Sequence, residues 1–194
     1  MTDVPSSPEA FFGSYIPARF SELSGLGQAS SAGSVVFSVP GAGAWAYRLT
    51  LGKLVVEAGA PADAIVRITV PDASFAPIVL AGAERLTGEA LSPEKQLLAF
   101  RALTLDSERA ALIRGVSGSV AFAVVDGAST HRVFVTPGSA EPNVAAPECE
   151  VSCEAASFWA LQSGTMNPFE LLMSGKLSIK GDAQIPMALS SLFV

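Results

Sequence analysis

Two cysteines and a single histidine are the residues of this chain with the most reactive side chains. Cys149 and Cys153 lie four positions apart in a segment that reads as a β-strand, where a rise of about 3.3 Å per residue separates their Cα atoms by ~13 Å. A disulfide needs a separation below about 7 Å, so we expect two free thiols that pack as small apolar side chains. A metal site needs more ligands, and His131 is the only histidine, so none is expected.

Two glycine-rich segments match catalytic or nucleotide-binding motifs only in part. Gly115-Val116-Ser117-Gly118-Ser119 lacks the last glycine of the Gly-x-Ser-x-Gly nucleophile turn. Residues 41–46 fit Gly-x-Gly-x-x-Ala, but a strand-like segment follows them, whereas pyrophosphate binding needs a helix N-terminus there. We interpret residues 41–46 as a hairpin turn, expect no catalytic residue and no cofactor, and favour a protein that is not an enzyme.

The composition indicates a folded chain with a large apolar interior. Of the 194 residues, 49% are apolar and 15% are charged, against about 25% charged residues in ordinary soluble domains. Intrinsic disorder needs the opposite balance. The length fits one domain or two small, closely fused ones.

Charge and hydropathy exclude two classes of partner. There are 12 basic and 18 acidic residues, the net charge is −6, and the lysines and arginines never form a run, so nucleic-acid binding is not expected. The longest uncharged stretch, residues 23–47, contains Pro40 and several glycines and serines. It does not sustain the ~20 apolar residues of a membrane span. The N-terminus has no basic or apolar leader, and we expect a cytoplasmic protein without stable membrane insertion.

The elements expected from the sequence occur in a similar order twice. Ser7-Pro8-Glu9 predicts a helix start; strands are predicted at 35–39, 45–51, 54–57 and 65–70, and Asp72 then begins a helix that ends at Gly82. Residues 119–122 resemble 34–37 at a displacement of 85, and 149–158 resemble 66–75 at a displacement of 83, both ending in Ala-Ser-Phe. This predicts an internal duplication; the alternative is chance similarity among segments rich in Ala, Ser and Val.

The segment between the two similar series has two interpretations. Residues 89–118 either close a first copy as helix–strand–helix, with 102–105 as the strand, or contain the opening helix of a second copy. Near the C-terminus, residues 169–173 predict a short helix, 176–180 a strand and 185–193 an amphipathic helix.

The C-terminal part of the chain allows a family to be named. The run Ala155-Ala156-Ser157-Phe158-Trp159-Ala160-Leu161-Gln162-Ser163-Gly164-Thr165-Met166-Asn167-Pro168-Phe169, followed by Met173-Ser174-Gly175-Lys176-Leu177-Ser178-Ile179-Lys180-Gly181-Asp182, resembles the C-terminal signature of sterol carrier protein type 2 domains. The resemblance implies an α+β fold, in which helices cover one face of a mixed, largely antiparallel sheet. With the repeat, it implies two fused pseudo-repeats, at residues 1–100 and 101–194.

The function implied by the resemblance is noncatalytic binding and carriage of a fatty acyl chain, sterol or phospholipid in an apolar tunnel. The alternative is a structural or protein-interaction module whose cavity has been filled, so a protein partner is possible. If the tunnel lies near the C-terminal helices, as in the family, its apolar wall is expected to include Phe158, Trp159, Phe169, Leu172, Met173, Met187, Leu189, Leu192 and Phe193.

Overall fold

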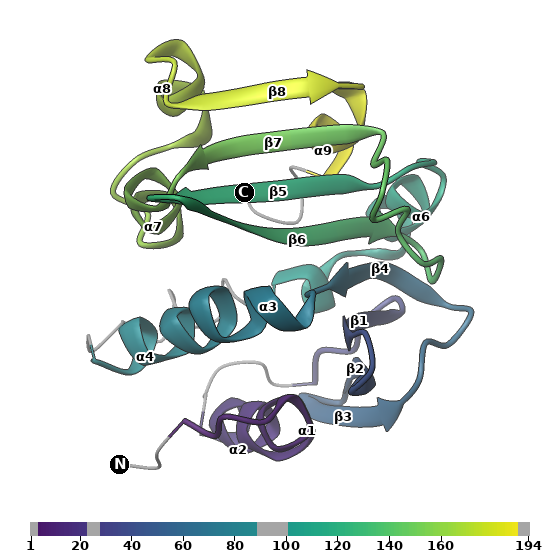
Figure 1. Cartoon of the computed structure of the whole chain (residues 1–194). Helices are drawn as coiled ribbons and strands as arrows, with labels where there is room; N and C mark the ends of the chain where they lie inside the picture. Colours follow the sequence, from purple (N-terminus) through teal and green to yellow (C-terminus); the bar gives the residue numbers. More distant parts are fainter. Residues whose placement is uncertain (1–3, 23–27, 89–100, 190–194) are drawn as a thin grey trace.

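A computed structural model describes residues 4–22, 28–88 and 101–189 of the chain. Within these residues, eight strands form a single sheet in the order β3-β2-β1-β4-β6-β5-β7-β8 (Figure 1). The strands are β1 (Ser34–Val39), β2 (Gly43–Thr50), β3 (Lys53–Ala58), β4 (Ala64–Thr69), β5 (Val120–Asp126), β6 (Ser129–Pro137), β7 (Cys149–Glu154) and β8 (Leu177–Gly181). Five of the neighbouring pairs are antiparallel, whereas β1/β4 and β5/β7 are parallel.

Helices precede, connect and follow these strands. The segment before the sheet comprises α1 (Pro8–Ala10), the π-helical η1 (Phe11–Tyr15) and α2 (Ile16–Ser21); after β4 come α3 (Asp72–Ser74), the π-helical η2 (Phe75–Leu80) and α4 (Ala81–Gly88). The remaining helices are the 3₁₀ turn η3 (Arg101–Thr104), α6 (Ser107–Arg114), α7 (Ala155–Gln162), α8 (Pro168–Met173) and α9 (Gln184–Leu189). The expected fold class, a mixed α+β architecture with a largely antiparallel sheet, is confirmed.

Two sequence predictions about the middle of the chain are wrong. The helix that starts at Asp72 does not end at Gly82 but continues to Gly88, because Gly82 has no positive φ and does not act as a helix terminator. Residues 101–104 form a 3₁₀ turn and Asp106 then caps α6, so the interpretation of 102–105 as a strand is excluded. The helix predicted at Ser92-Pro93-Glu94 lies outside the described residues.

The two parallel pairs have matching registers. In the N-terminal part Val35 lies opposite Val66, and in the C-terminal part Val120 lies opposite Cys149. Shifting Val35 by 85 residues and Val66 by 83 gives this second pair, so the two sequence displacements coincide with equivalent places in the sheet. The two parts join where β4 pairs with β6, with Val66 opposite Pro137.

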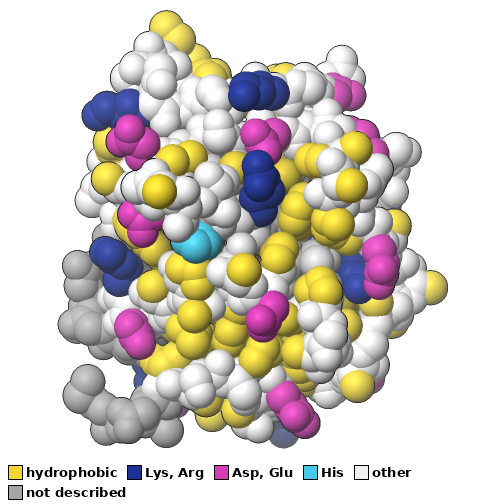
Figure 2. All heavy atoms as spheres, in the orientation of Figure 1, with side chains coloured by type: hydrophobic (Ala, Val, Ile, Leu, Met, Phe, Trp, Pro, Cys, Tyr) yellow, Lys and Arg dark blue, Asp and Glu magenta, His cyan; other side chains and the backbone are white. Residues whose placement is uncertain are grey.

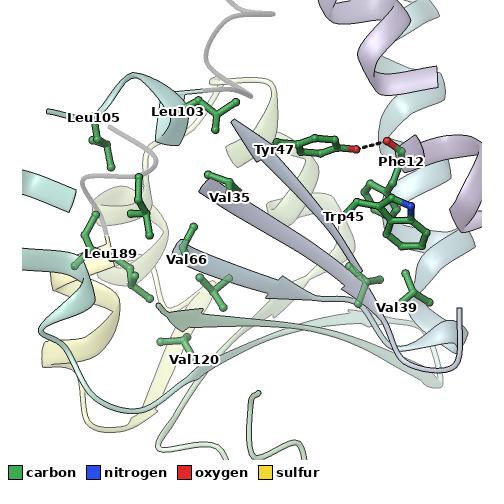
Figure 3. Close-up of a cluster of buried hydrophobic side chains, with 14 of the residues drawn as sticks. Phe12, Val35, Val39, Trp45, Tyr47, Val66, Leu103, Leu105, Val120 and Leu189 are labelled. Carbon is green, nitrogen blue, oxygen red and sulfur yellow. Dashed lines mark hydrogen bonds between the residues drawn. The ribbon is translucent and has the colours of Figure 1, made fainter. Parts of the chain in front are cut away.

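One apolar core lies on the helix-covered face and runs through both parts of the sheet. Figure 3 shows side chains of this cluster from β1, β2, β4 and β5 together with Leu103 and Leu105, and with Leu189 of α9. The expected division into residues 1–100 and 101–194 stays a prediction, while strands from both segments belong to the same sheet.

Candidate functional site

The C-terminal strands present an ordered apolar surface to the helices. Register places Val133, Phe122, Val151 and Ile179 side by side across β6, β5, β7 and β8. We call these four residues the apolar row. Val151 is buried at 6% exposure, whereas the other three are half-buried and pack at the margin of the core. The row is therefore a continuous, mainly aliphatic floor that the covering elements do not fully bury.

Short helices from the C-terminal segment cover this floor. Ile185 and Leu189 of α9 are buried at 3% and 0% exposure, and Leu171 is the fully buried residue of α8. Leu161 of α7 and Met166, in the turn after it, are half-buried against the same core. Figure 1 places α7 and α8 at one end of β5, β7 and β8, and α9 toward the other end.

The corresponding surface of the N-terminal strands is filled by aromatic rings. Phe37 occupies the position of Phe122 at the displacement of 85 residues, and the ring of Phe12 from η1 stacks on Phe37 at 5.2 Å. Phe12 also stacks on Trp45 at 5.2 Å and contacts Phe75. Because protein interiors are close-packed, this part of the core is solid, and the less completely buried floor lies in the C-terminal part.

The nine residues expected in the apolar wall occupy different environments. Phe158 and Trp159 are half-buried and their rings meet at 4.8 Å. Leu189 is fully buried, whereas Phe169, Leu172, Met173 and Met187 are 69%, 42%, 73% and 72% exposed. Leu192 and Phe193 lie outside the described residues. The structure thus brings Phe158 and Trp159 together and leaves three α8 residues at the surface; a shared ligand wall stays a prediction.

Trp159 also links the two parts of the molecule. The guanidinium carbon of Arg85 in α4 lies 4.6 Å from the centre of the Trp159 ring. A Cβ atom added at Gly82 would be 3.6 Å from that ring, so α4 approaches α7 closely there. The side chain of Trp159 therefore joins the helix that follows β4 to the helix that follows β7, in a cation–π contact.

Sequence reasoning missed the apolar row and the buried residue of α8. Val133, Phe122, Val151 and Ile179 alternate with polar or small residues, so a sheet face was detectable but its partners across the sheet were not. In α8, three of four consecutive residues from Phe169 are apolar, and Leu171 alone is buried. A six-residue helix is too short for its periodicity to identify the inward position.

The titratable groups beside the floor are held in their neutral forms or in structural contacts. Burial raises the pKa of the Cys153 thiol; burial, and secondarily the charge of Asp182, raises the pKa of the Cys149 thiol. Both cysteines are free, as expected. Among the described residues, His131 makes no hydrogen bond to a serine, cysteine or carboxylate, and no three acidic, histidine or cysteine side chains gather as a metal site.

Comparisons with known proteins agree with the resemblance in the C-terminal half. A family model described as the SCP-2 sterol transfer family matches residues 99–194. A search of curated proteins found no significant match. No helix in the described ranges has the length and apolar character needed to cross a bilayer.

Solved structures resemble parts of the chain. The palmitated SCP2L2 of Aedes aegypti is 18% identical, with 59% of this chain and 93% of that chain covered and a TM-score of 0.38. Sterol carrier protein domain 2 of Helicoverpa armigera is 24% identical, with 54% and 91% covered and a TM-score of 0.35. A UbiJ-SCP2 ubiquinone synthesis protein is 20% identical, with 61% and 95% covered and a TM-score of 0.33. Scores this low carry no argument about the ligand.

Proposed function

Since the chain belongs, through residues 99–194, to the SCP-2 sterol transfer family, we propose that it binds and carries a hydrophobic ligand without catalysing a reaction. The ligand class is a fatty acyl chain, a sterol or a phospholipid. Burying an alkyl chain contributes about 0.8 kcal/mol per CH₂ group, so such a ligand needs an apolar surface and few polar contacts. The observation that carries the proposal is the family match over the half of the chain that contains the apolar row.

The proposed ligand position is the space between the apolar row and helices α7, α8 and α9. Two observations support this half over the other. The row is mostly half-buried, and its side chains are aliphatic apart from Phe122. In the N-terminal half, the equivalent surface carries the stacked rings of Phe12, Phe37 and Trp45, which leave little room for a second molecule.

We also propose that the molecule arose by internal duplication, with β5, β6 and β7 corresponding to β1, β2 and β4. The matching registers of the two parallel pairs support this. So does a repeated contact: Ser34 Oγ donates to Asp63 at 3.4 Å, and Ser119 Oγ donates to Glu148 at 3.0 Å. In each case the serine opens the first strand and the carboxylate precedes the strand parallel to it.

In this arrangement the solid N-terminal copy has a structural role. It supplies β4, which pairs with β6 and so covers an edge that an isolated C-terminal copy would expose. Exposed strand edges invite aggregation. One copy therefore supports the other, and only the C-terminal copy is proposed to hold ligand.

A pair of matched substitutions tests the proposed position. Val151 and Ile68 occupy equivalent places at the displacement of 83 residues, and both pack with the core. If a ligand occupies the C-terminal half, Val151→Trp fills its space, so uptake of a fluorescent fatty acid is lost while the melting temperature changes little. Ile68→Trp overpacks the solid half at a cost of about 1–3 kcal/mol and leaves uptake in the remaining folded protein.

Native mass spectrometry of protein purified from cells provides the second measurement. Retained masses of a few hundred daltons support ligand carriage. A ligand-free mass, together with a wild-type protein that takes up no fatty acid and a Val151→Trp variant that is strongly destabilised, would instead favour the filled structural module.

A further inference from the structure

We propose that α8 is a membrane-docking element that inserts its apolar side chains into the surface of a phospholipid bilayer. This surface consists of Phe169, Leu172 and Met173, which are 69%, 42% and 73% exposed. They contribute three of the nine large apolar side chains that are exposed in the described residues, within five consecutive positions; the other six are distributed over other helices, strands, turns and loops. In Figure 2, hydrophobic side-chain atoms reach the upper edge of the molecule, where Figure 1 places α8.

The exposed side chains stand on a well-anchored helix. Asn167 and Glu170 form a reciprocal capping box: Glu170 N–H donates to Asn167 Oδ1 at 2.8 Å, and Asn167 N–H donates to Glu170 Oε2 at 3.2 Å. Leu171 is fully buried beneath the helix, and the N–H of Lys176 donates to its carbonyl at 2.9 Å. The helix is thus fixed to the core through one residue while its neighbours point outward.

Charge around the helix favours a phospholipid surface. Lys176, which follows the helix directly, and Lys180 on the edge strand β8 are exposed. Within the described ranges, neither lysine belongs to an ion pair. The only acidic residue of α8, Glu170, is engaged in the capping box. Two unpaired lysines beside three apolar side chains complement lipid phosphates above an acyl layer.

The size of the surface favours a bilayer over a protein. A stable protein–protein interface takes about 20–30 residues from each partner, whereas only three large apolar residues are exposed here. Membrane association has no such minimum, because each apolar side chain that reaches the acyl boundary contributes in proportion to its area. A shallow, reversible contact also suits a protein that exchanges lipid with membranes, so this inference rests on the proposed function.

Vesicle partitioning of ligand-free protein tests the proposal. The double variant Phe169→Ser, Met173→Ser is expected to partition onto phosphatidylcholine vesicles at least about tenfold less than wild type, since burial of each side chain contributes a factor of this order. The matched control is Leu112→Ser, which removes a side chain that is 68% exposed on α6 and should leave partitioning unchanged. All three proteins should share one melting temperature, because the replaced side chains are exposed.

The lysine has its own test. Lys176→Gln should weaken partitioning about fivefold on vesicles that contain anionic phosphatidylglycerol, and this difference should vanish in high salt. Equal partitioning of wild type and double variant, or no partitioning of wild type, would overturn the proposal. A wild-type dimer that the double variant dissociates, seen by sedimentation, would assign the surface to a second copy of the chain instead.

Fatty-acid uptake by the wild-type protein in vesicle-free solution separates this inference from the proposed function. A protein that partitions onto vesicles but takes up no fatty acid would overturn ligand carriage and retain membrane docking. A protein that takes up fatty acid but ignores vesicles would overturn the docking and retain carriage.

Discussion

The hydroxyl of Tyr47 donates a hydrogen bond of 2.6 Å to the backbone carbonyl of Phe12, and so ties the second strand of the sheet to the N-terminal helix (Figure 3). The N–H of Ile16 donates to the carbonyl of Phe11 in the π-helical pattern, and in this pattern Phe12 would need the N–H of residue 17. That residue is Pro17, which has no N–H. The Tyr47 hydroxyl therefore satisfies a buried acceptor that the helix itself leaves without a donor.

Replacement of Tyr47 by Phe should destabilise the fold by about 1–3 kcal/mol, because the Phe12 carbonyl is then buried without this partner. Urea unfolding at neutral pH measures the loss. A Phe variant as stable as wild type would show that solvent or another donor reaches the carbonyl.

The same tyrosine predicts a loss of stability in alkali. Burial raises the pKa of the Tyr47 hydroxyl far above its usual value, which is about 10. Above pH ~10 the unfolded chain releases this proton while the folded chain keeps it, so stability falls as the pH rises. Since Tyr47→Phe lacks this contribution, the stability difference between wild type and variant should narrow between pH 9 and 11.

Glu148 predicts a change on the acid side. Its carboxylate accepts hydrogen bonds from the backbone N–H of Ser119 at 2.7 Å and from the Ser119 hydroxyl at 3.0 Å, and the backbone contact with Ser119 is the largest cause that lowers its pKa. A lowered folded-state pKa stabilises the fold above the unfolded value near 4.3 and is lost as the pH falls through the folded value. Glu148→Gln should therefore be less stable than wild type at pH 7 and approach it at pH 3, measured by thermal unfolding.

The two cysteines should differ in accessibility. Cys149 is 1% exposed and Cys153 is half-buried, and burial raises the pKa of both thiols. Alkylation of native protein at pH 8 should therefore be slow and should modify Cys153 first, since the thiolate is the reactive form. Mass spectrometry of the digested protein locates the label. After unfolding without reductant both thiols should react, and an intramolecular disulfide would contradict the strand assignment of β7.

Two glycines predict opposite effects of the same substitution. Gly82 lies inside α4 without a positive φ, and an added Cβ would make ordinary contact with Trp159, so Gly82→Ala should be neutral or stabilise the fold by up to about 1 kcal/mol. Gly181 has a φ of +93°, and an added Cβ would collide with the carbonyl of Glu148. Gly181→Ala should lower the melting temperature clearly, and a result in the reverse order would contradict the packing at both sites.

The sequence alone determined the local elements and the family resemblance. The predicted strands at 35–39, 45–51, 54–57 and 65–70 match β1 to β4 within two residues at each end, because alternating apolar residues bounded by turns are a local signal. The C-terminal signature indicated the family that the match at residues 99–194 then supported. The helix capping at Asn167 and Glu170 is likewise encoded within four residues.

Only the tertiary structure decided how these elements share surfaces. The pairing of β4 with β6, which joins both halves into one sheet, links Val66 to Pro137, and no local pattern specifies a partner so distant in sequence. The same holds for α8, where the sequence suggested Phe169, Leu172 and Met173 as inward residues but packing buries Leu171. Which side of a short helix faces the core depends on the direction of the chain as it leaves β7 and enters β8. Burial is thus decided by contacts made across the sheet, which the order of residues within a single element does not contain.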